Sequence, residues 1–200
     1  MQTVVSGFLL GLSLILPIGA QNSLVLRLGL LGRHVLPVVV FCALSDAILI
    51  AAGVWGFSGL LALVPQLQTW AALGGGLFLL AYGAQSYRTA LRGGQKMGDG
   101  DAPPSVWRTL GVAAAMTWLN PHVYLDTVAL VGAVANQSPS PFLFGLGAII
   151  ASFSFFFGLG FGARGLAPIM RSPLAWRVLD GFIGTVMLIL AVKLLWPLIP

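Results

Sequence analysis

Two aspartates in this chain stand inside long apolar runs of sequence. Asp46 lies in VVVFCALSDAILIAAGVWG, and Asp126 lies in LNPHVYLDTVALVGAV. Placing a carboxylate at membrane depth costs about 2.5–3.5 kcal/mol on insertion scales, so such residues normally face a polar cavity. The chain contains only five acidic residues in total. The position of these two therefore indicates chemistry with a small cation or a cationic solute.

Asp46 follows Ser45 and lies about 11 residues after the start of its apolar run, or ~17 Å along a helix. The run contains no lysine or arginine that could neutralise the carboxylate. An apolar environment favours the neutral form of a carboxyl group. Two interpretations stay open: a protonated aspartate hydrogen-bonded to a neighbour, or one that exchanges its proton for a cationic substrate.

The motif LPIGAQN, residues 16–22, interrupts the first apolar run. Pro17 removes a backbone donor and clashes with the preceding helical turn, and Gly19 tolerates the resulting distortion. Gln21 and Asn22 then supply amide groups where lipid offers no hydrogen-bond partner. We expect a kinked helix that lines a polar cavity. The alternative is a kink whose backbone groups are satisfied by neighbouring helices, which membrane helices tolerate.

The motif WLNPHVYLDT, residues 118–127, predicts a helix that breaks and restarts. Asn120 and Pro121 are residue types favoured at the N-cap and the first helical position. A restarted helix presents free N–H groups and the positive end of its dipole, which suit a carboxylate such as that of an α-amino acid. His122 and Asp126 are four residues apart and share one helix face. The neighbouring stripe holds Asn120, Tyr124 and Thr127. For His122, a packed, hydrogen-bonded histidine without a functional role is the alternative.

The composition is that of an all-α integral membrane protein. Hydrophobic residues make up 58% of the 200 residues and charged residues only 8%, against about 25% in soluble domains. The apolar runs are roughly 20 residues long, which suits helices rather than barrel strands. The net charge of +5 does not indicate nucleic-acid binding, because the basic residues are spread along loops. The single cysteine, Cys42, excludes an internal disulfide and a cysteine metal site.

We predict six transmembrane helices arranged as two three-helix inverted repeats. The first repeat covers about residues 1–87, a cytoplasmic loop covers 88–108, and the second repeat covers 109–200, as one transporter domain. The first helix of each half carries a proline, Pro17 or Pro121, which is typical of interrupted helices that meet near the midplane. The predicted spans are Val4–Leu26, Val35–Phe57, Leu67–Tyr87, Thr109–Ala135, Phe142–Ala163 and Trp176–Trp196.

Basic residues mark the odd-numbered loops, and the second and fourth loops carry no charge. The positive-inside rule therefore places loops one, three and five in the cytoplasm and both termini outside. The N-terminal segment lacks the basic residues of a signal peptide, so we predict that it is the first span. Asp180 stands three residues after Arg177 near the cytoplasmic edge, where an ion pair between the two would explain it. The basic residues of these loops are Arg27, Arg33, Arg88, Arg92, Lys96, Arg108, Arg164, Arg171 and Arg177.

The strings ILPIGAQN, ALSDAILIAAG and TWLNPHVYLDT, together with the six-span layout, resemble the LysE-type exporters of basic amino acids, and most closely their arginine-exporting branch. The resemblance covers essentially the whole chain. It implies proton-driven export of arginine, lysine or analogues such as canavanine across the bacterial cytoplasmic membrane, without a cofactor. It also implies that Asp46, Asn22, Asn120, Pro121 and Asp126 are functional residues.

Adding the residues of the two motifs gives a wider set of candidates for substrate binding and transport. The set is Pro17, Gly19, Gln21, Asn22, Ser45, Asp46, Asn120, Pro121, His122, Tyr124, Asp126 and Thr127. The expected partners are a basic amino acid, protons and the lipid bilayer, and no nucleic acid. Small residues such as Gly7 and Gly11 indicate close helix packing within the monomer, with an interface in a homo-oligomer as the alternative.

Three other functions are alternatives to the export of basic amino acids. An exporter of neutral amino acids such as threonine or homoserine would need less intramembrane acid. A divalent-metal exporter would place more metal-binding side chains in its spans. An intramembrane enzyme acting on lipid would need a nucleophile with an adjacent base. The chain also lacks a Walker motif, so ATP-driven transport by this chain alone is not expected.

Overall fold

The structure is a computed structural model that describes residues 1–17, 19–57, 65–92, 105–166, 168–169 and 172–198. The side chains at positions 56–57, 65–68, 70–72, 122 and 125 also lie outside the description. Within the described part, the chain is helical and contains no strand. The α-helices are α1 (Gln2–Ile15), α2 (Ala20–Leu31), α3 (Val35–Ala52), α5 (Pro65–Leu91), α6 (Val106–Trp118), α7 (Pro121–Val123), α8 (Val131–Asn136), α9 (Pro141–Gly162) and α10 (Pro173–Leu195). Shorter π-helical and 3-10 segments are η1 (Gly53–Phe57), η2 (Tyr124–Leu130), η3 (Ala163–Leu166) and η5 (Trp196–Leu198).

Three helix ends coincide with capping residues in the sequence. The Ser105 side chain accepts a hydrogen bond from the backbone N–H of Arg108 (3.2 Å) and so caps α6. Ser140 caps α9, with Pro141 at its first helical position, where a missing N–H costs nothing. Gly32 ends α2 in the left-handed conformation, with a φ of 63°, which glycine adopts without steric cost. These signals lie in the sequence itself.

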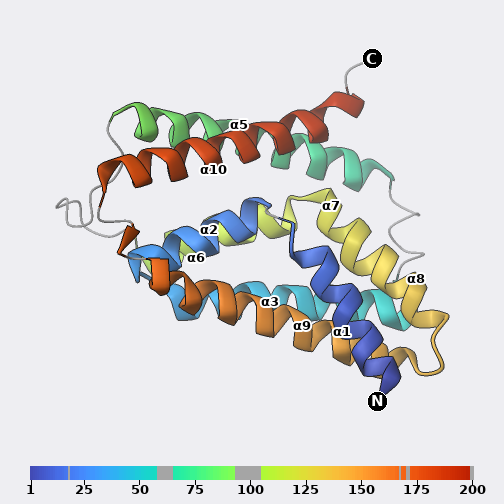
Figure 1. The fold of residues 1–200 in the computed structure, drawn as a ribbon. Coiled ribbons are helices and arrows are strands. Elements are labelled where there is room, and N and C mark those ends of the chain that lie inside the picture. The colour runs from blue at the N-terminus through green and yellow to red at the C-terminus, as the bar shows by residue number, and fades with distance from the viewer. Residues whose placement is uncertain (18, 58–64, 93–104, 167, 170–171, 199–200) are drawn as a thin grey trace.

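The helices form layers that Figure 1 shows from the side. α5 and α10 lie side by side in one layer, α3 and α9 lie in another, and α2 and α6 run between them (Figure 1). α1 crosses α9 so closely that a Cβ on Gly7 would lie 2.0 Å from the carbonyl oxygen of Phe144. In Figure 1, α2, α5 and α9 end at the left, where α3, α6 and α10 begin, whereas α1 begins and α10 ends at the right. The loops therefore alternate between two ends of the molecule.

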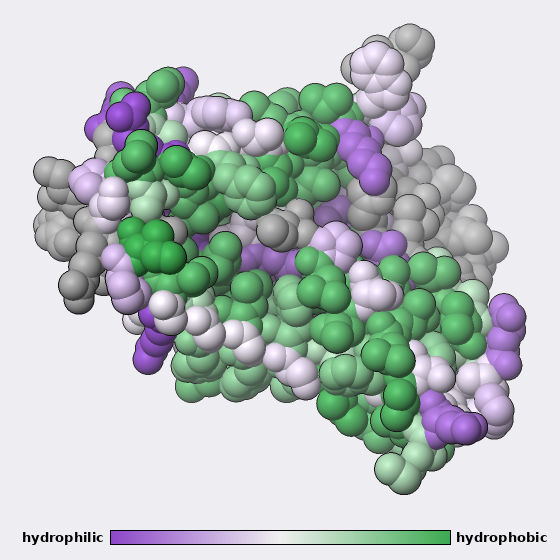
Figure 2. All heavy atoms as spheres, viewed as in Figure 1, coloured by the Kyte–Doolittle hydropathy of each residue, from purple (hydrophilic) through white to green (hydrophobic). Residues whose placement is uncertain are grey.

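The outer surface is apolar, as expected of a chain whose outer solvent is lipid. On α3, Leu44 and Ile48 are about half exposed while Val38 and Val39 are fully buried. On α10, Ile189 and Val192 are likewise exposed and Met187 is buried. Apolar residues cover most of the face seen in Figure 2, and hydrophilic residues gather toward the ends and in a narrow strip between the α5–α10 layer and the helices below it.

Several helices agree with the predicted spans, and the first span differs. The span predicted over Val35–Phe57 matches α3 followed by η1. The first span is two helices, α1 and α2, bent by 84°, because Pro17 and Gly19 stop the helix altogether. Three of the described helices are long and apolar enough to cross a membrane by themselves, with α1–α2 as a fourth if the bent pair is one span. Most of the central polar loop, including Lys96, the second loop and Arg171 lie outside the described residues.

Candidate functional site

The carboxylate of Asp46 is enclosed by protein between α3 and α9. The residue is only 4% exposed. Its Oδ2 accepts a hydrogen bond from the hydroxyl of Ser152 at 2.9 Å, and Ser152 is itself fully buried. A carboxylate held this way is turned away from lipid. The structure therefore places Asp46 in the protein interior, and the polar cavity that its sequence position predicts stays a prediction. The sequence alone held no signal for Ser152.

Asn22 hydrogen-bonds to the backbone at the first helix break. Its Nδ2 donates to the carbonyl oxygens of Ile15 (2.7 Å) and Pro17 (3.0 Å), at the end of α1. These carbonyls have lost their helical partners because the helix stops there. Gly19 precedes α2 in an extended conformation. In this conformation, the amide group of Asn22 stabilises the bend.

Gln21 brings the first break close to Asp46. Its side chain lies next to the thiol of Cys42, which is one helical turn before Asp46 on α3. Its Nε2 is buried and donates to no acceptor among the described residues. A buried donor without an acceptor costs free energy, so this amide is a candidate contact for a carboxylate that enters the site.

The second helix break lies where the sequence predicts it. α6 ends at Trp118, and α7 begins at Pro121. The hydroxyl of Tyr124 donates to the carbonyl oxygen of Trp118 (2.8 Å), and the indole Nε1 of Trp118 donates to Ser45 Oγ (3.3 Å). These bonds tie the break to α3, next to Asp46. Trp118 opens the WLNPHVYLDT motif, but the sequence alone does not show that it contacts Ser45.

Asp126 lies on the π-helical segment η2 and is partly buried. Isolated π-helical turns often occur at functional sites. The hydroxyl of the buried Thr127, the next residue, donates to the carbonyl oxygen of Val123. The predicted shared face of His122 and Asp126 is not tested, because the His122 side chain lies outside the described residues.

The two aspartate-bearing segments run parallel and side by side. Ser45 contacts Trp118, and a Cβ on Gly53 would lie 2.4 Å from the carbonyl oxygen of Val128. A Cβ on Gly132 would in turn lie 2.5 Å from the carbonyl oxygen of Gly53. The residue numbers of the contacting positions rise together along the two segments, so the segments run in the same direction. Asp46, next to Ser45, therefore lies at the level of the second break. Asp126 follows that break on the neighbouring segment.

Asp180 does not pair with the arginine that the sequence suggests. It is completely buried, and Arg27 Nη1 on α2 lies 2.7 Å from its Oδ1. Arg177 instead donates from Nε to the carbonyl oxygen of Ala90 at 3.0 Å. The predicted Arg177–Asp180 pair is therefore wrong, because α10 turns Asp180 toward α2 and Arg177 toward α5.

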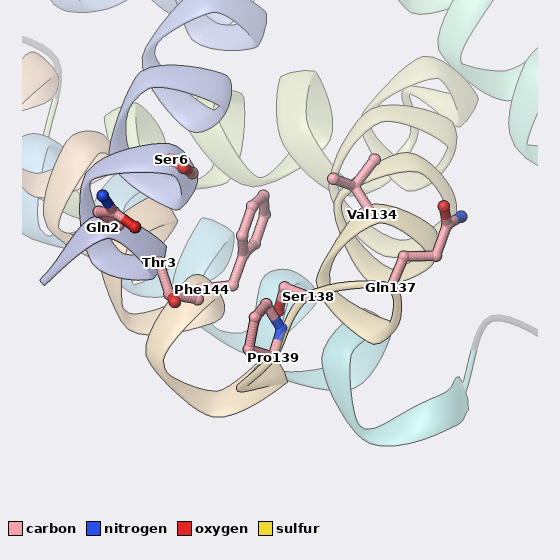
Figure 3. Close-up of a pocket in the computed structure, with 8 residues that line it drawn as sticks. All are labelled: Gln2, Thr3, Ser6, Val134, Gln137, Ser138, Pro139 and Phe144. Carbon is pink, nitrogen blue, oxygen red and sulfur yellow. The ribbon is translucent and has the colours of Figure 1, made fainter.

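An open pocket of about 350 Å³ lies between the start of α1 and the loop after α8. Gln2, Thr3 and Ser6 of α1 line one side, and Gln137 and Ser138 line the other (Figure 3). Its lining carries amides and hydroxyls rather than charges. Among the described residues, no group of three or more histidine, cysteine or acidic side chains could hold a metal ion.

Comparison with known proteins identifies a family and several relatives that this chain resembles. The profile of the LysE type translocator family matches residues 12–197. The arginine exporter protein ArgO of Salmonella typhimurium is 40% identical over 192 residues, which cover 94% of this chain and 90% of that protein. The proteins of the same name from Salmonella enteritidis and Salmonella paratyphi A match to the same extent. No solved structure matches. These relatives are exporters rather than enzymes.

Proposed function

This chain belongs to the LysE-type translocator family, and from that premise we propose that it exports basic amino acids, with arginine as the principal substrate, across a bacterial cytoplasmic membrane. The observation that carries the proposal is the enclosed carboxylate of Asp46, next to two interrupted helices. A cationic substrate needs such a carboxylate to leave water. The 40% identity to arginine exporters over nearly the whole chain supports the choice of substrate.

The site offers complementary groups for each part of a basic amino acid. Asp46, and Asp126 on the adjacent segment, would bind the guanidinium or ammonium group. The helix that restarts at Pro121 would bind the substrate carboxylate through its free N–H groups. The buried Nε2 of Gln21 is a further donor. These assignments follow charge and hydrogen-bonding capacity.

Export requires an energy source, and protons can supply it through the same carboxylates. Moving a monocation out against 100 mV, negative inside, costs about 2.3 kcal/mol. A passive pore could not do this. We infer that the substrate cation displaces a proton from an aspartate and that the proton moves inward. An enclosed carboxyl group can alternate between a neutral state that binds a proton and an ionised state that binds the cation.

Helix pairing supports two inverted repeats that rock against each other. Asp46 is the twelfth residue of α3, and Ser152 is the twelfth residue of α9. Pro17 follows the first residue of α1 by the same interval, 15 residues, as Pro121 follows the first residue of α6. Corresponding helices also pair, since α3 packs on α9 and α5 packs on α10. A two-fold axis in the membrane plane would pass close to the Asp46–Ser152 hydrogen bond.

Flux of labelled arginine in proteoliposomes tests the proposal. We expect a pH gradient alone to drive arginine accumulation, and a membrane potential alone to drive it according to the net charge moved. Asp46→Asn should lower proton-driven flux at least about tenfold, the effect of losing ~1.4 kcal/mol of stabilisation, while Asp126→Asn reports on the second carboxylate. Excess threonine or homoserine should not compete.

Full proton-coupled arginine flux in Asp46→Asn would count decisively against this mechanism. Competition by threonine at least equal to that by unlabelled arginine would point to a neutral amino-acid exporter instead.

A further inference from the structure

A second buried carboxylate lies outside the site described above. Asp180 on α10 is fully buried, and the Arg27 side chain on α2 is 13% exposed. Because α10 lies in the α5–α10 layer and α2 among the helices beneath it (Figure 1), the ion pair joins the two. Tyr82 on α5 lies within electrostatic reach of both charges. Three helices therefore converge on one carboxylate within the membrane-spanning part of the chain.

The ion pair is close but incomplete. Arg27 Nη1 approaches Asp180 Oδ1 to 2.7 Å, yet neither carboxylate oxygen accepts a hydrogen bond of good geometry from a described residue. A guanidinium and a carboxylate bind most strongly through two parallel hydrogen bonds. Among the described residues, the single close contact leaves accepting capacity on a carboxylate whose side chain is 0% exposed. Such a carboxylate can exchange one guanidinium for another that is better aligned.

The position of the Arg27–Asp180 ion pair suits an intermediate binding site on a transport path. Arg27 lies on α2, five residues after Asn22, so the helix that begins at the first break also carries this guanidinium. Four residues beyond Arg27 the helix ends, at the loop that carries Arg33. The pair thus lies between the basic, proposed cytoplasmic end of the molecule and the level of Asp46.

We propose that Asp180 is a binding site for the guanidinium or ammonium group of the substrate, and that Arg27 occupies it in this conformation as an internal substitute. The arriving cation takes the place of Arg27, which turns toward the cytoplasmic end through the side where it is already exposed. The charge around Asp180 stays balanced throughout, so the buried carboxylate is never left alone. This inference rests on the proposed function, because it requires a basic amino acid as substrate.

Removal of Arg27 tests the exchange directly. Arg27→Ala leaves a space shaped for a guanidinium and an unpaired buried carboxylate, which destabilises the protein. We expect free arginine to raise the Tm of purified Arg27→Ala more than that of the wild type, and citrulline, its neutral isostere, to have no such extra effect. In the double variant Arg27→Ala with Asp180→Asn, the response to arginine should fall to that of the wild type or below it.

Asp180→Asn tests the same inference if Arg27→Ala does not fold. It should raise the KM for arginine at least about tenfold in proteoliposomes, and Arg177→Gln, which alters a guanidinium on the same helix that donates to a backbone carbonyl, should not. An unchanged KM in Asp180→Asn, or equal responses of Arg27→Ala to arginine and citrulline, would overturn the inference while arginine flux through the wild type stands. Absence of arginine flux in the wild type would instead remove the proposed function.

Discussion

At the scale of single residues, the two buried carboxylates differ in the group that contacts them. Asp46 has a hydroxyl donor from another helix, and Asp180 has a guanidinium. A hydroxyl that donates to a carboxylate stabilises the ionised form without neutralising it, whereas a guanidinium neutralises it. Asp46 is therefore available for a cation or a proton, and Asp180 becomes available only when Arg27 leaves.

The hydroxyl of Ser152 should consequently matter for transport. Ser152→Ala removes the donor that positions the Asp46 carboxylate and should lower arginine flux about tenfold or more, in line with the ~1.5–3 kcal/mol attributed to hydrogen bonds with charged groups. The matched control is Ser154→Ala, because Ser154 lies two residues further along α9 and is exposed. Equal flux in the two variants would show that Asp46 does not depend on this contact.

Sequence reasoning identified the reactive residues better than their partners. Asp46 was placed correctly because an acid in an apolar run must be enclosed. Asp180 was paired with the nearest arginine in sequence, yet its partner Arg27 lies some 150 residues away in the chain. Ser152 and Trp118 were missed for the same reason: a residue type shows hydrogen-bonding capacity, and only the packing of helices shows which groups meet.

At the scale of elements, the two interrupted helices are stabilised differently. Asn22 hydrogen-bonds the end of α1 from the helix that follows, so the first break is closed within its own segment. The second break is tied to another helix, through Trp118 and Ser45. The prolines predicted both interruptions. The 84° bend could not be predicted, because its size depends on how α1 packs on α9.

The contact between the two aspartate-bearing segments depends on glycine. Gly53→Ala would place a Cβ 2.4 Å from the carbonyl oxygen of Val128 and force the segments apart, at a cost of about 1–3 kcal/mol for overpacking. We expect a lower Tm in detergent and reduced flux. Gly158→Ala is the control, because a Cβ there meets nothing within 4 Å, and such a change in a helix is stabilising by about 0.4–1 kcal/mol. A Tm for Gly53→Ala at or above that of Gly158→Ala would contradict the described packing.

At the scale of the whole molecule, the distribution of basic residues agrees with the directions in which the helices run. The ends of α2, α5 and α9, which precede the loops predicted to carry the basic residues, lie at one end of the molecule, and the start of α1 and the end of α10 lie at the other (Figure 1). Alternation of this kind supports the six-span topology that the apolar runs predict. The side of the membrane that each end faces rests on the positive-inside rule.

Cysteine labelling in intact cells tests the orientation. Gln137→Cys and Ser172→Cys each introduce a thiol at an exposed, uncharged position, one in the loop after α8 and one before α10. The native Cys42 is buried and should not react. We expect an impermeant maleimide to label Gln137→Cys from outside the cell and Ser172→Cys only in inverted vesicles. The reverse pattern would place both termini in the cytoplasm.

The bend between α1 and α2 also constrains how the protein is made. α1 has 14 residues and α2 has 12, or about 21 and 18 Å, and neither alone reaches across a hydrocarbon layer of about 30 Å. The helix on which α1 packs, α9, is synthesised more than 120 residues later. The packing that fixes the depth of α1 in the bilayer is therefore complete only after α9 has been synthesised.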